Sequence, residues 1–507
     1  MQSIDGIEES KLLADVFAKF FERTCKPNTI ERFEEEESKF KQQFPADRFT
    51  TCADDSVKIS VQLVDDCISK LKLGKAAGLD LLTGKRIKYS HPCVIGIITK
   101  LSNVMLVNEY VPDAFGESVT TPIPKITTGK ALESLENYRG ISINPVISKV
   151  FELVIIRIYQ KFLTSSRYQF GFKKKIACSH AHFLLEKTVD FFLKRGSNVN
   201  LCSIDISKAF DKVNRYILFD KLKTKNCPEK FILILQCWLS KSTTTVKWNG
   251  HFSIPISLSC GVRQGSILAP YLFAIYVDNI LCKLHSVNVG CHIHFTNFNS
   301  LMYADDLLLI ALTLKDLQLM VNICSEELEK IDMRSNAKKS ACMRVGDRFH
   351  VKLADILINQ TPIPWCHEIS YLGLVLVAGR KLNYSFHIKK AKYFGAVNSV
   401  LGKIGTCNNA GLVLSLMASK CSPILAYNLE ALSLPKSTLS HLCYVYSAIY
   451  SKLFKTFDKT IIAQCQLQFG YLPLVFELDL KRLNFLHKLS HTEVLSVILI
   501  YYILILL

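Results

Sequence analysis

The sequence has no pair of cysteines separated by two residues, although it contains 18 cysteines in 507 residues. These cysteines are scattered, so neither a zinc module nor a disulfide framework is expected. A long apolar run is missing as well. The most apolar stretch, 494–507, has 14 residues and includes Ser496, whereas a membrane-spanning helix needs about 20. We therefore interpret the tail, 491–507, as sequence unrelated to the rest of the chain, with no known role, and expect no membrane partner.

The N-terminus lacks a secretory signal, because Met1–Glu9 is polar and acidic. Acidic residues are scarce relative to basic ones: 44 Asp and Glu stand against 62 Lys and Arg, a net charge of +18. This excess favours a polyanionic partner such as a nucleic acid, although a lysine-rich solvated surface produces the same count. We expect an intracellular protein of several domains, since 49% hydrophobic content supplies a sizeable core.

The stretch Ser300–Leu312 sets two adjacent carboxylates, Asp305 and Asp306, inside an otherwise apolar run. The residues on either side predict two short buried strands, with the acidic pair at the hairpin turn. Burying two neighbouring carboxylates is costly unless cations neutralise them, and aspartate oxygens suit Mg²⁺. The stretch alone leaves two interpretations open: a metal site for phosphoryl transfer, or a tight turn whose aspartates face the solvent.

A second acidic position lies near the end of another predicted strand. The strand is expected at 201–206 and carries Asp205, and a helix is predicted from about 213 to 222. An aspartate at the carboxyl end of a strand is well placed to hold a metal ion. Phe210 and Asp211 follow in the connection between the two elements.

Two cations precede the acidic sites in the chain. Lys125 ends the proline-stiffened segment 121–125, and Arg139 comes just before an apolar, strand-like run. Such residues are suited to hold the oxygens of a triphosphate, arginine through a forked pair of donors. Isolated cations are more often surface charges, so these two residues alone do not decide between the roles.

Two further segments carry groups that suit a nucleotide or a nucleic acid. The loop 261–265 supplies donors from Arg263 and Gln264, and Gly265 permits close approach of the backbone to a ligand. The segment 169–175, QFGFKKK, interleaves aromatic rings with lysines, a pattern that suits base stacking and backbone binding.

The remaining pattern predicts further elements. Apolar spacing of three to four residues predicts an amphipathic helix within 56–73. The pair Asn249–Gly250 predicts a hairpin turn, and 371–376 is expected to form a short hairpin. Beyond about residue 385 the pattern is helical.

In this order, the motifs resemble those of the reverse transcriptases of non-LTR (LINE-type) retrotransposons, from about Ser56 to about Glu430. The likeness rests on TPIPK (121–125), NYRGISI (137–143), SIDISKAFDKV (203–213), GVRQGSILAP (261–270), YADD (303–306), NAKKS (336–340) and YLGLVL (371–376). It implies an α+β right-hand polymerase, with fingers, a palm whose antiparallel sheet carries the YADD hairpin, and a helical thumb. The implied domains are a helical N-terminal remnant or linker at 1–55, a pre-fingers extension at 56–104, a reverse transcriptase domain of fingers and palm at 105–377, a helical thumb-like region at 378–490 and the tail at 491–507.

The resemblance also implies the residues of the site. The catalytic residues would be Asp205, Asp305 and Asp306, and with Ile206 they would bind two Mg²⁺ ions, with Mn²⁺ as a substitute. The nucleotide-binding residues would be Lys125, Arg139, Phe210 as a steric gate under the sugar, Gln264, Gly265 and Lys339, with Lys338 an alternative register for the last. The primer and template contacts would be Gly171, Phe172, Arg263, Tyr303, Leu372 and Gly373.

The implied activity is RNA-directed DNA synthesis, with an RNA template, a DNA primer and dNTPs as partners, in the nucleus or a cytoplasmic ribonucleoprotein. The sequence departs from the family pattern at two places: Leu81 stands where members usually carry glycine, and Lys173–Cys178 replaces a small turn bearing Gly and Ser. Neither an upstream endonuclease nor a downstream zinc knuckle is visible, so we expect a fragment of a truncated element. The sequence does not indicate the oligomeric state.

Other functions compete with this one. An RNA-dependent RNA polymerase also uses paired aspartates, and Asp211 superficially supports it, but Phe210 and the absence of asparagine from 261–269 argue against it. Group II intron maturases and telomerase are nearer relatives than these polymerases, but the residues of the motifs at 137–143 and 261–266 favour the LINE type. The last alternative is a catalytically inactive relic or a repurposed RNA-binding protein, which the truncated ends support and the intact aspartates oppose.

Overall fold

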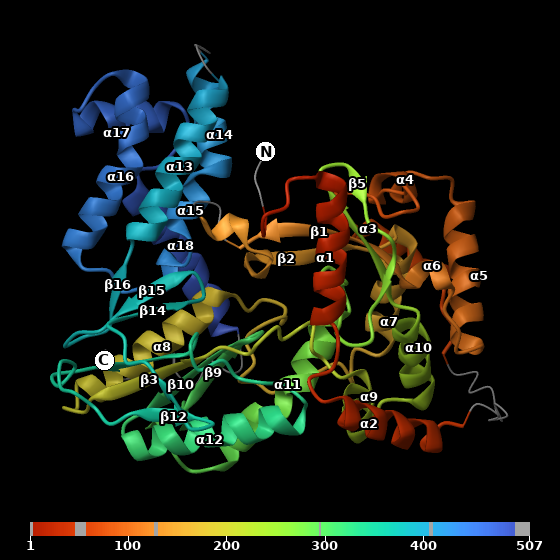
Figure 1. The fold of residues 1–507 in the computed structure, drawn as a ribbon. Coiled ribbons are helices and arrows are strands. Elements are labelled where there is room, and N and C mark those ends of the chain that lie inside the picture. The colour runs from red at the N-terminus through yellow and green to blue at the C-terminus, as the bar shows by residue number, and fades with distance from the viewer. Residues whose placement is uncertain (1–3, 46–56, 126–129, 294–295, 405–408, 492–507) are drawn as a thin grey trace. The chain divides into compact units, whose positions relative to one another are not determined.

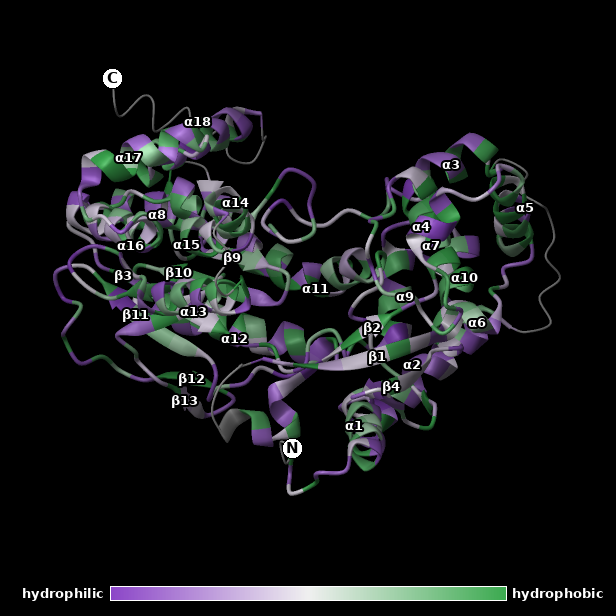
Figure 2. Cartoon of the chain, turned by 90° about the horizontal axis from the view of Figure 1, so that it is seen from above, coloured by the Kyte–Doolittle hydropathy of each residue, from purple (hydrophilic) through white to green (hydrophobic). Residues whose placement is uncertain are grey.

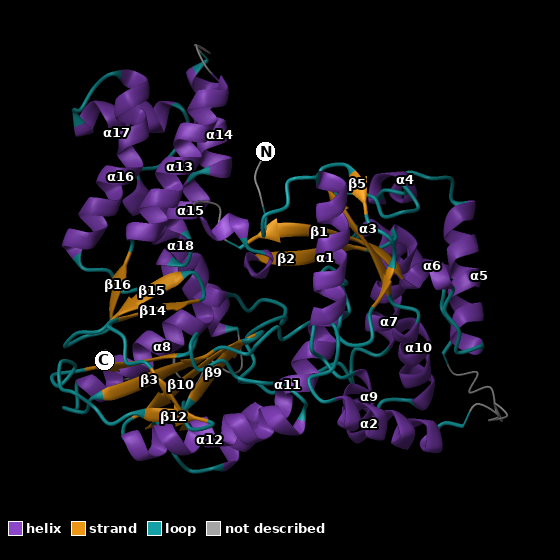
Figure 3. Cartoon of the chain, viewed as in Figure 1, coloured by secondary structure: helices purple, strands orange, loops and turns teal. Residues whose placement is uncertain are grey.

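The computed structural model describes residues 4–45, 57–125, 130–293, 296–404 and 409–491 (Figure 1). Two compact units form, each from three stretches of chain. The first unit comprises Met1–Ser166, Ile206–Lys283 and Ile323–Asn336, and the second comprises Arg167–Asp205, Leu284–Asn322 and Ala337–Leu507. Both units contain helices and strands (Figure 3), so the predicted α+β class is confirmed.

A mixed sheet of the order β2-β1-β4-β5 organises the first unit. β1 (Glu117–Pro124) is antiparallel to β2 (Tyr138–Ile143) and parallel to β4 (Thr243–Trp248). β4 also pairs with β5 (His251–Phe252) and β6 (Ile256–Ser257). The turn between β4 and β5 is Asn249–Gly250, as predicted, and both residues have positive φ, 45° and 87°, which asparagine and glycine tolerate best.

Helices surround this sheet and extend the first unit. They are α1 (Ser10–Thr24), α2 (Ile30–Gln43), α3 (Val61–Ser69), α4 (Gly84–Lys88), α5 (Cys93–Val107), α6 (Asp113–Gly116), α7 (Val146–Ile158), α9 (Arg215–Thr224) and α10 (Glu229–Ser240), with 3-10 turns η1 (Lys130–Glu133) and η2 (Leu135–Asn137). By the same division, α11 (Ala269–Ser286) and α12 (Leu314–Lys330) include residues of both units.

The apolar face of α1 packs against the sheet of the first unit. Its buried residues Leu13, Phe17 and Phe21 recur every four positions, which places them on one face of a helix. The Phe17 ring lies 5.1 Å from that of Tyr138 in β2 and 5.0 Å from that of Trp248 in β4. Figure 2 shows the corresponding mixture of hydrophobic and hydrophilic residues along α1.

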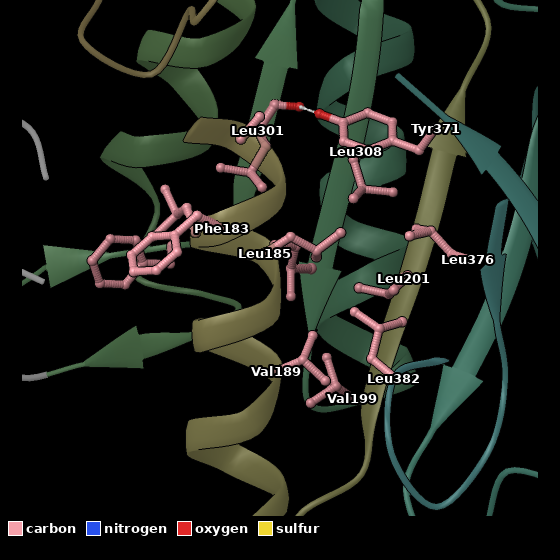
Figure 4. Close-up of a cluster of buried hydrophobic side chains, with 14 of the residues drawn as sticks. Phe183, Leu185, Val189, Val199, Leu201, Leu301, Leu308, Tyr371, Leu376 and Leu382 are labelled. Atoms are coloured by element: carbon pink, nitrogen blue, oxygen red, sulfur yellow. Dashed lines mark hydrogen bonds between the residues drawn. The ribbon is translucent and has the colours of Figure 1, made fainter. Parts of the chain in front are cut away.

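A four-stranded sheet of the order β11-β3-β10-β9 organises the second unit. Its strands are β11 (Ala341–Val345), β3 (Val199–Ile204), β10 (Asp306–Ala311) and β9 (Ser300–Tyr303), and every neighbouring pair is antiparallel. Leu185 and Val189 of α8 (Cys178–Leu193) lie with Leu201 and Leu308 in one buried apolar cluster (Figure 4). Close packing of this kind makes the sheet a rigid support for residues at its edge.

A smaller sheet and a group of helices complete the second unit. β14 (Glu368–Tyr371), β15 (Leu374–Val377) and β16 (Asn383–Ser385) pair antiparallel, with the hairpin at 371–376 where predicted. The helices that follow are α13 (His387–Ile404), α14 (Ala410–Lys420), α15 (Ser422–Ala426), α16 (Lys436–Phe454), α17 (Lys459–Gln468) and α18 (Leu474–Ser490), with the turn η3 (Leu429–Ala431). Two short pairs also form: β7 (His292–Ile293) with β8 (Thr296–Asn297), and β12 (Ile356–Ile358) with β13 (Thr361–Ile363).

Two predicted elements differ in extent from those of the structure. β3 begins and ends two residues before the strand expected at 201–206, so Asp205 follows the strand instead of lying within it. The helix expected within 56–73 is α3 alone, because Ser60 caps it: its hydroxyl accepts from the Leu63 N–H over 3.2 Å.

Some expectations lie beyond the part of the chain that the structure describes. Apart from His491, the tail at 491–507 is outside it, as is the expected boundary between residues 55 and 56. Within the described residues, we find no helix that combines the length and the apolar character needed to cross a membrane.

Candidate functional site

The register of β3 and β10 brings two of the predicted catalytic residues together. Ile204 is opposite Leu307 in this antiparallel pair, so the next step of the same register sets Asp205 against Asp306. Like charges directly opposite each other on neighbouring strands are destabilising unless a cation lies between them. The end of this sheet is therefore an acidic position suited to a cation.

The third carboxylate lies in the hairpin between β9 and β10. Tyr303 and Asp306 are partners in this pairing, which leaves Ala304 and Asp305 as a two-residue loop. Asp205 and Asp305 are half-buried and Asp306 is exposed. All three carboxylates belong to the second unit and retain access to solvent, which an incoming ion requires.

The carboxylate oxygens of these aspartates are hard ligands, which Mg²⁺ prefers, so they fit the metal that the resemblance implies. Across the described ranges, no group of three or more His, Cys, Asp or Glu side chains is arranged to hold a metal ion. The register therefore supports a pair of carboxylate ligands at this end of the sheet. Ile206 is buried, belongs to the first unit and forms a β-bridge with Ser335.

The basic turn after α12 reaches the same end of the sheet. The backbone N–H of Asp205 donates to the hydroxyl of Ser340 over 3.1 Å. Lys338 and Lys339 immediately precede Ser340, and both are exposed. Lys339, the predicted phosphate-binding lysine, is therefore the chain neighbour of the residue that binds the Asp205 backbone.

Gly171 lies against the turn that carries Asp305, and Phe172 follows it in the chain. A Cβ atom on Gly171 would lie 2.5 Å from the Ala304 nitrogen, so only glycine fits this close approach. Phe172 has a positive φ of 63° and is half-buried. Burial raises the pKa of Tyr303 to about 12, and the nearby Cys178 thiol acts in the same direction.

Leu372 and Gly373 form the turn between β14 and β15. Both have positive φ, 44° and 78°, the pattern of a tight two-residue hairpin turn. The Leu372 carbonyl oxygen lies 3.4 Å from His182 Nε2 and accepts from Asn428 Nδ2 over 3.4 Å. A Cβ on Gly373 would lie 3.1 Å from the Tyr427 ring. This turn is therefore anchored on both sides within the second unit.

In the first unit, the loop 261–265 lines a small cavity together with β1 and β2. Residues that contribute to its wall include Thr120, Gly140, Ser142, Asp211 and Gln264. The Ser142 N–H donates to the Gln264 carbonyl oxygen over 2.8 Å and ties the loop to β2. Glycine is required at 265, because φ is +132° and a Cβ atom would lie 2.1 Å from the Ser142 oxygen.

Gln264 faces a carboxylate in this cavity. It donates from its side-chain nitrogen to Asp211 Oδ1 over 3.2 Å. Asp211 keeps some exposed surface, but desolvation of its carboxylate raises its pKa to about 6, while this hydrogen bond and the charges of Lys208, Arg139 and Lys125 act to lower it. The two predicted triphosphate-binding residues thus lie within electrostatic range of the Gln264 loop.

Lys125 and Arg139 lie near each other where β1 and β2 pair. Arg139 is the β-partner of Ile123, and the Lys125 ammonium group donates to the Glu136 carbonyl oxygen over 2.7 Å. Both side chains are exposed. An exposed pair of cations at one end of a strand pair is accessible to a phosphate group.

Phe210 is held by an aromatic stack. Its ring centroid lies 4.3 Å from that of Phe273 in α11, with the planes 17° apart. Phe210 is half-buried, whereas Phe273 is fully buried. The stack fixes the direction of the Phe210 ring and leaves part of it accessible.

Arg263 is directed into the protein. The side chain is 9% exposed, and its guanidinium donates to the carbonyl oxygens of Phe115 and Gly116. It therefore braces the loop 261–265 against α6. The geometry gives it a supporting position beside the cavity.

Two residues that the sequence pattern did not single out hold these segments in place. Arg215, buried at the start of α9, donates to the carbonyl oxygens of Leu239, Cys260 and Gly261. Gln169 is fully buried beside the Ala304–Asp305 turn. In the sequence, each of these two residues is recognisable only as a polar residue among apolar neighbours. The sequence does not show which backbone groups they bind.

A profile of the family described as reverse transcriptase (RNA-dependent DNA polymerase) matches residues 123–376, half of the chain. The chain therefore belongs to the reverse transcriptase family. This match and the relatives below confirm the predicted relationship to non-LTR retrotransposons.

Relatives from retrotransposable elements align with this chain. The Pol polyprotein of the type-2 element R2DM of Drosophila melanogaster is 25% identical over 55% of this chain and 25% of that protein. The RNA-directed DNA polymerase from the mobile element jockey of the same fly is 26% identical over 65% of this chain and 36% of that protein. The chain thus spans about a quarter to a third of these relatives. A telomerase from Candida albicans, solved with a fragment of telomeric RNA, aligns over 79% of this chain and 67% of its own, with 14% identity and a TM-score of 0.38.

Proposed function

We propose that this chain is an RNA-directed DNA polymerase that adds deoxynucleotides to a primer 3′-hydroxyl on an RNA template. The observation that carries the proposal is the end of the β3–β10–β9 sheet, where the pairing of Ile204 with Leu307 and of Tyr303 with Asp306 brings the chain at Asp205 next to the Asp305–Asp306 turn. Membership of the reverse transcriptase family supports it. The net charge of +18 suits the polyanionic template and primer.

The same proposal assigns the parts of a right-hand polymerase. The palm is the β11-β3-β10-β9 sheet, the fingers include β1 and β2, and the thumb comprises the helices from α13 to α18. On this assignment, fingers and palm lie within 105–377 and the thumb-like region within 378–490. The antiparallel sheet and the helical C-terminal part support the assignment.

Asp205, Asp305 and Asp306 would hold two Mg²⁺ ions, or Mn²⁺, with Ile206 beside them. Such ions, when bound, lower the pKa of an attacking hydroxyl and neutralise charge on a leaving pyrophosphate. The work of the chain is to hold these carboxylates at one end of a packed sheet, where they stay partly exposed to an incoming ion and substrate.

Binding and selection of the nucleotide would fall to a second set of residues. Lys125, Arg139 and Lys339 would hold the triphosphate, as charge-assisted donors to phosphate oxygens. Gln264 and Gly265 would contact the incoming nucleotide. The Phe210 ring, fixed by its stack on Phe273, would exclude a ribose 2′-hydroxyl and favour dNTPs.

Primer and template would contact a third set. Leu372 and Gly373 would lie at the primer, with Tyr303 beside the catalytic turn. Gly171 and Phe172 would contact the template, and Arg263 would act on it through the loop that it braces.

Primer extension on a poly(rA)/oligo(dT) template with dTTP and Mg²⁺ tests the function. We expect extension by the wild-type chain and its loss in Asp305→Ala. Asp347→Ala is the matched control, because Asp347 is exposed and follows the opposite end of β11 in the same sheet. It should keep wild-type activity.

A folded wild-type chain that binds RNA but does not extend the primer would contradict the proposal. The alternative, an inactive relic or a repurposed RNA-binding protein, would then hold. Equal extension by wild type and Asp305→Ala would also contradict the proposed site.

A further inference from the structure

The turn that carries Asp305 has an unusual backbone. Ala304, its first residue, has a positive φ of 57°. A residue other than glycine pays for this conformation, at about 1–3 kcal/mol, and keeps it only where its surroundings impose it. A two-residue hairpin loop calls for a positive φ at its first residue, usually glycine, so an alanine there gains from a contact that holds it in this conformation.

Gln169 supplies that contact. Its side-chain oxygen accepts from the Ala304 N–H over 2.9 Å, and its side-chain nitrogen donates to the Ala304 carbonyl oxygen over 3.1 Å. The same oxygen accepts from the Gly171 N–H over 2.9 Å. Gln169 is 0% exposed, so one buried amide satisfies three backbone groups around the turn.

Gln169 is itself held in place by the sheet. It forms a parallel bridge with Met302 of β9, and the N–H of the next residue, Phe170, donates to the Met302 carbonyl oxygen over 2.7 Å. Phe170 is 1% exposed and belongs to the same buried apolar cluster as Leu201 and Leu308. The amide is therefore attached to the same rigid support as the strand that enters the turn.

We propose that Gln169 is a positioning residue that imposes the conformation of Ala304 and so directs the Asp305 carboxylate. The inference rests on the proposed polymerase function, because it assigns Asp305 its role. Gln169 touches no substrate: it acts through the backbone of the turn. Glutamine suits the task because a neutral amide both donates and accepts.

The hydrogen-bonding chemistry of the amide predicts which substitution of Gln169 is the more damaging. Gln169→Glu keeps the two acceptor bonds of the side-chain oxygen but loses the donor to the Ala304 carbonyl. Gln169→Met keeps the length of the side chain and leaves all three backbone groups without this partner. We expect the methionine variant to be the more damaging.

The decisive measurement separates kcat from KM in primer extension. Gln169→Met should lower kcat by about 100-fold, as expected for a misplacement of about 1 Å at a reacting centre, while the KM for dTTP and the affinity for primer–template stay unchanged. Adding Ala304→Gly to Gln169→Met should not restore kcat, because a glycine turn is free to adopt other conformations. Ala304→Gly alone should keep wild-type kcat, since Gln169 still holds the turn.

A matched control distinguishes positioning from loss of stability. Asn200 is another fully buried amide on this sheet, and its nitrogen donates to the carbonyl oxygens of Ala311 and Leu312, at the other end of β10. Asn200→Leu should destabilise the protein as Gln169→Met does, yet keep kcat. Equal loss of kcat in both variants, or wild-type kcat in Gln169→Met, would overturn the proposal.

A second readout does not depend on turnover. Mg²⁺ should raise the melting temperature of the wild-type chain, and the Mg²⁺ concentration needed should increase in Gln169→Met but not in Asn200→Leu. An inactive wild type would contradict the proposed function. Even then, the change in the Mg²⁺ concentration needed to raise the melting temperature would decide the role of Gln169. An identical Mg²⁺ response in wild type and Gln169→Met would overturn that role.

Discussion

Gln264 donates a hydrogen bond from its side-chain nitrogen to Asp211 over 3.2 Å, and so joins the loop 261–265 to the connection that follows β3. The geometry makes Asp211 the group that orients the amide of Gln264. A charged carboxylate only accepts hydrogen bonds, whereas a protonated one also donates. The orientation of this amide should therefore depend on pH.

Stability should follow the ionisation of Asp211. Desolvation raises its pKa from the ordinary 3.8 to about 6. The folded state therefore holds the proton more tightly, so stability should fall as pH rises from about 3.8 to about 6, by up to about 3 kcal/mol, and level off above. Asp211→Asn should remove this dependence, as measured by urea unfolding across the window.

The pH dependence of activity should also reflect the ionisation of Asp211. With wild type, kcat/KM for dTTP should fall below pH 6 as Asp211 takes up its proton. In Asp211→Asn, kcat/KM should not fall in this pH range. If the fall below pH 6 persists in the variant, the ionisation belongs to another residue.

Asp205 and Asp306 should repel each other when no cation is present. Because the β3–β10 register, continued by one residue beyond the Ile204–Leu307 pair, sets them opposite each other, Asp306→Asn should raise the free energy of unfolding in EDTA, by about 0.2–1 kcal/mol. Mg²⁺ should stabilise the wild type and not the variant, since a ligand stabilises the state that binds it. Melting curves with and without Mg²⁺ test both effects.

The control for this pair is Asp347→Asn, at the opposite end of the sheet. It should leave the Mg²⁺ response intact. Stabilisation of Asp306→Asn by Mg²⁺ to the wild-type extent would show that the ion binds elsewhere.

Phe210 should set the choice between deoxy- and ribonucleotides. Phe210→Ala removes the ring that stacks on Phe273 and should lower discrimination against rNTPs by about tenfold or more. Phe210→Tyr keeps the ring and should keep the discrimination. The measurement is the ratio of kcat/KM for dTTP and UTP, and an unchanged ratio in Phe210→Ala would contradict the gate.

Gly265→Ala should displace the loop that carries Gln264. The added Cβ would lie 2.1 Å from the Ser142 oxygen, so the backbone of the loop or of Ser142 must shift, which strains the Ser142–Gln264 hydrogen bond. We expect a raised KM for dTTP together with a loss of stability of about 1–3 kcal/mol.

Gly250→Ala is the matched control for this substitution. Gly250 also has a positive φ, +87°, but a Cβ there meets nothing within 4 Å. It should cost about 1 kcal/mol from backbone strain alone and leave the KM for dTTP unchanged. An equal rise of KM in both variants would contradict a specific role for the loop.

Local chemistry determined much of the fold from the sequence alone. The Asn249–Gly250 turn, the 371–376 hairpin and the helices after residue 385 all form as predicted. Each depends on residues close together in the chain, whose backbone preferences and apolar spacing act over one turn or one hairpin. The motif around Asp305 likewise predicted a loop between two apolar strands, and the structure has one.

Tertiary structure alone decided which distant groups meet. The opposition of Asp205 and Asp306 depends on the register between strands about a hundred residues apart, and the contact of Gln169 with Ala304 spans 135 residues. Arg263, a predicted primer or template contact, donates to backbone oxygens of Phe115 and Gly116, partners that its sequence neighbours do not indicate. A sequence states which groups can donate and accept, whereas only the packing of strands and helices selects the partners, because each buried polar group must be satisfied where the fold places it.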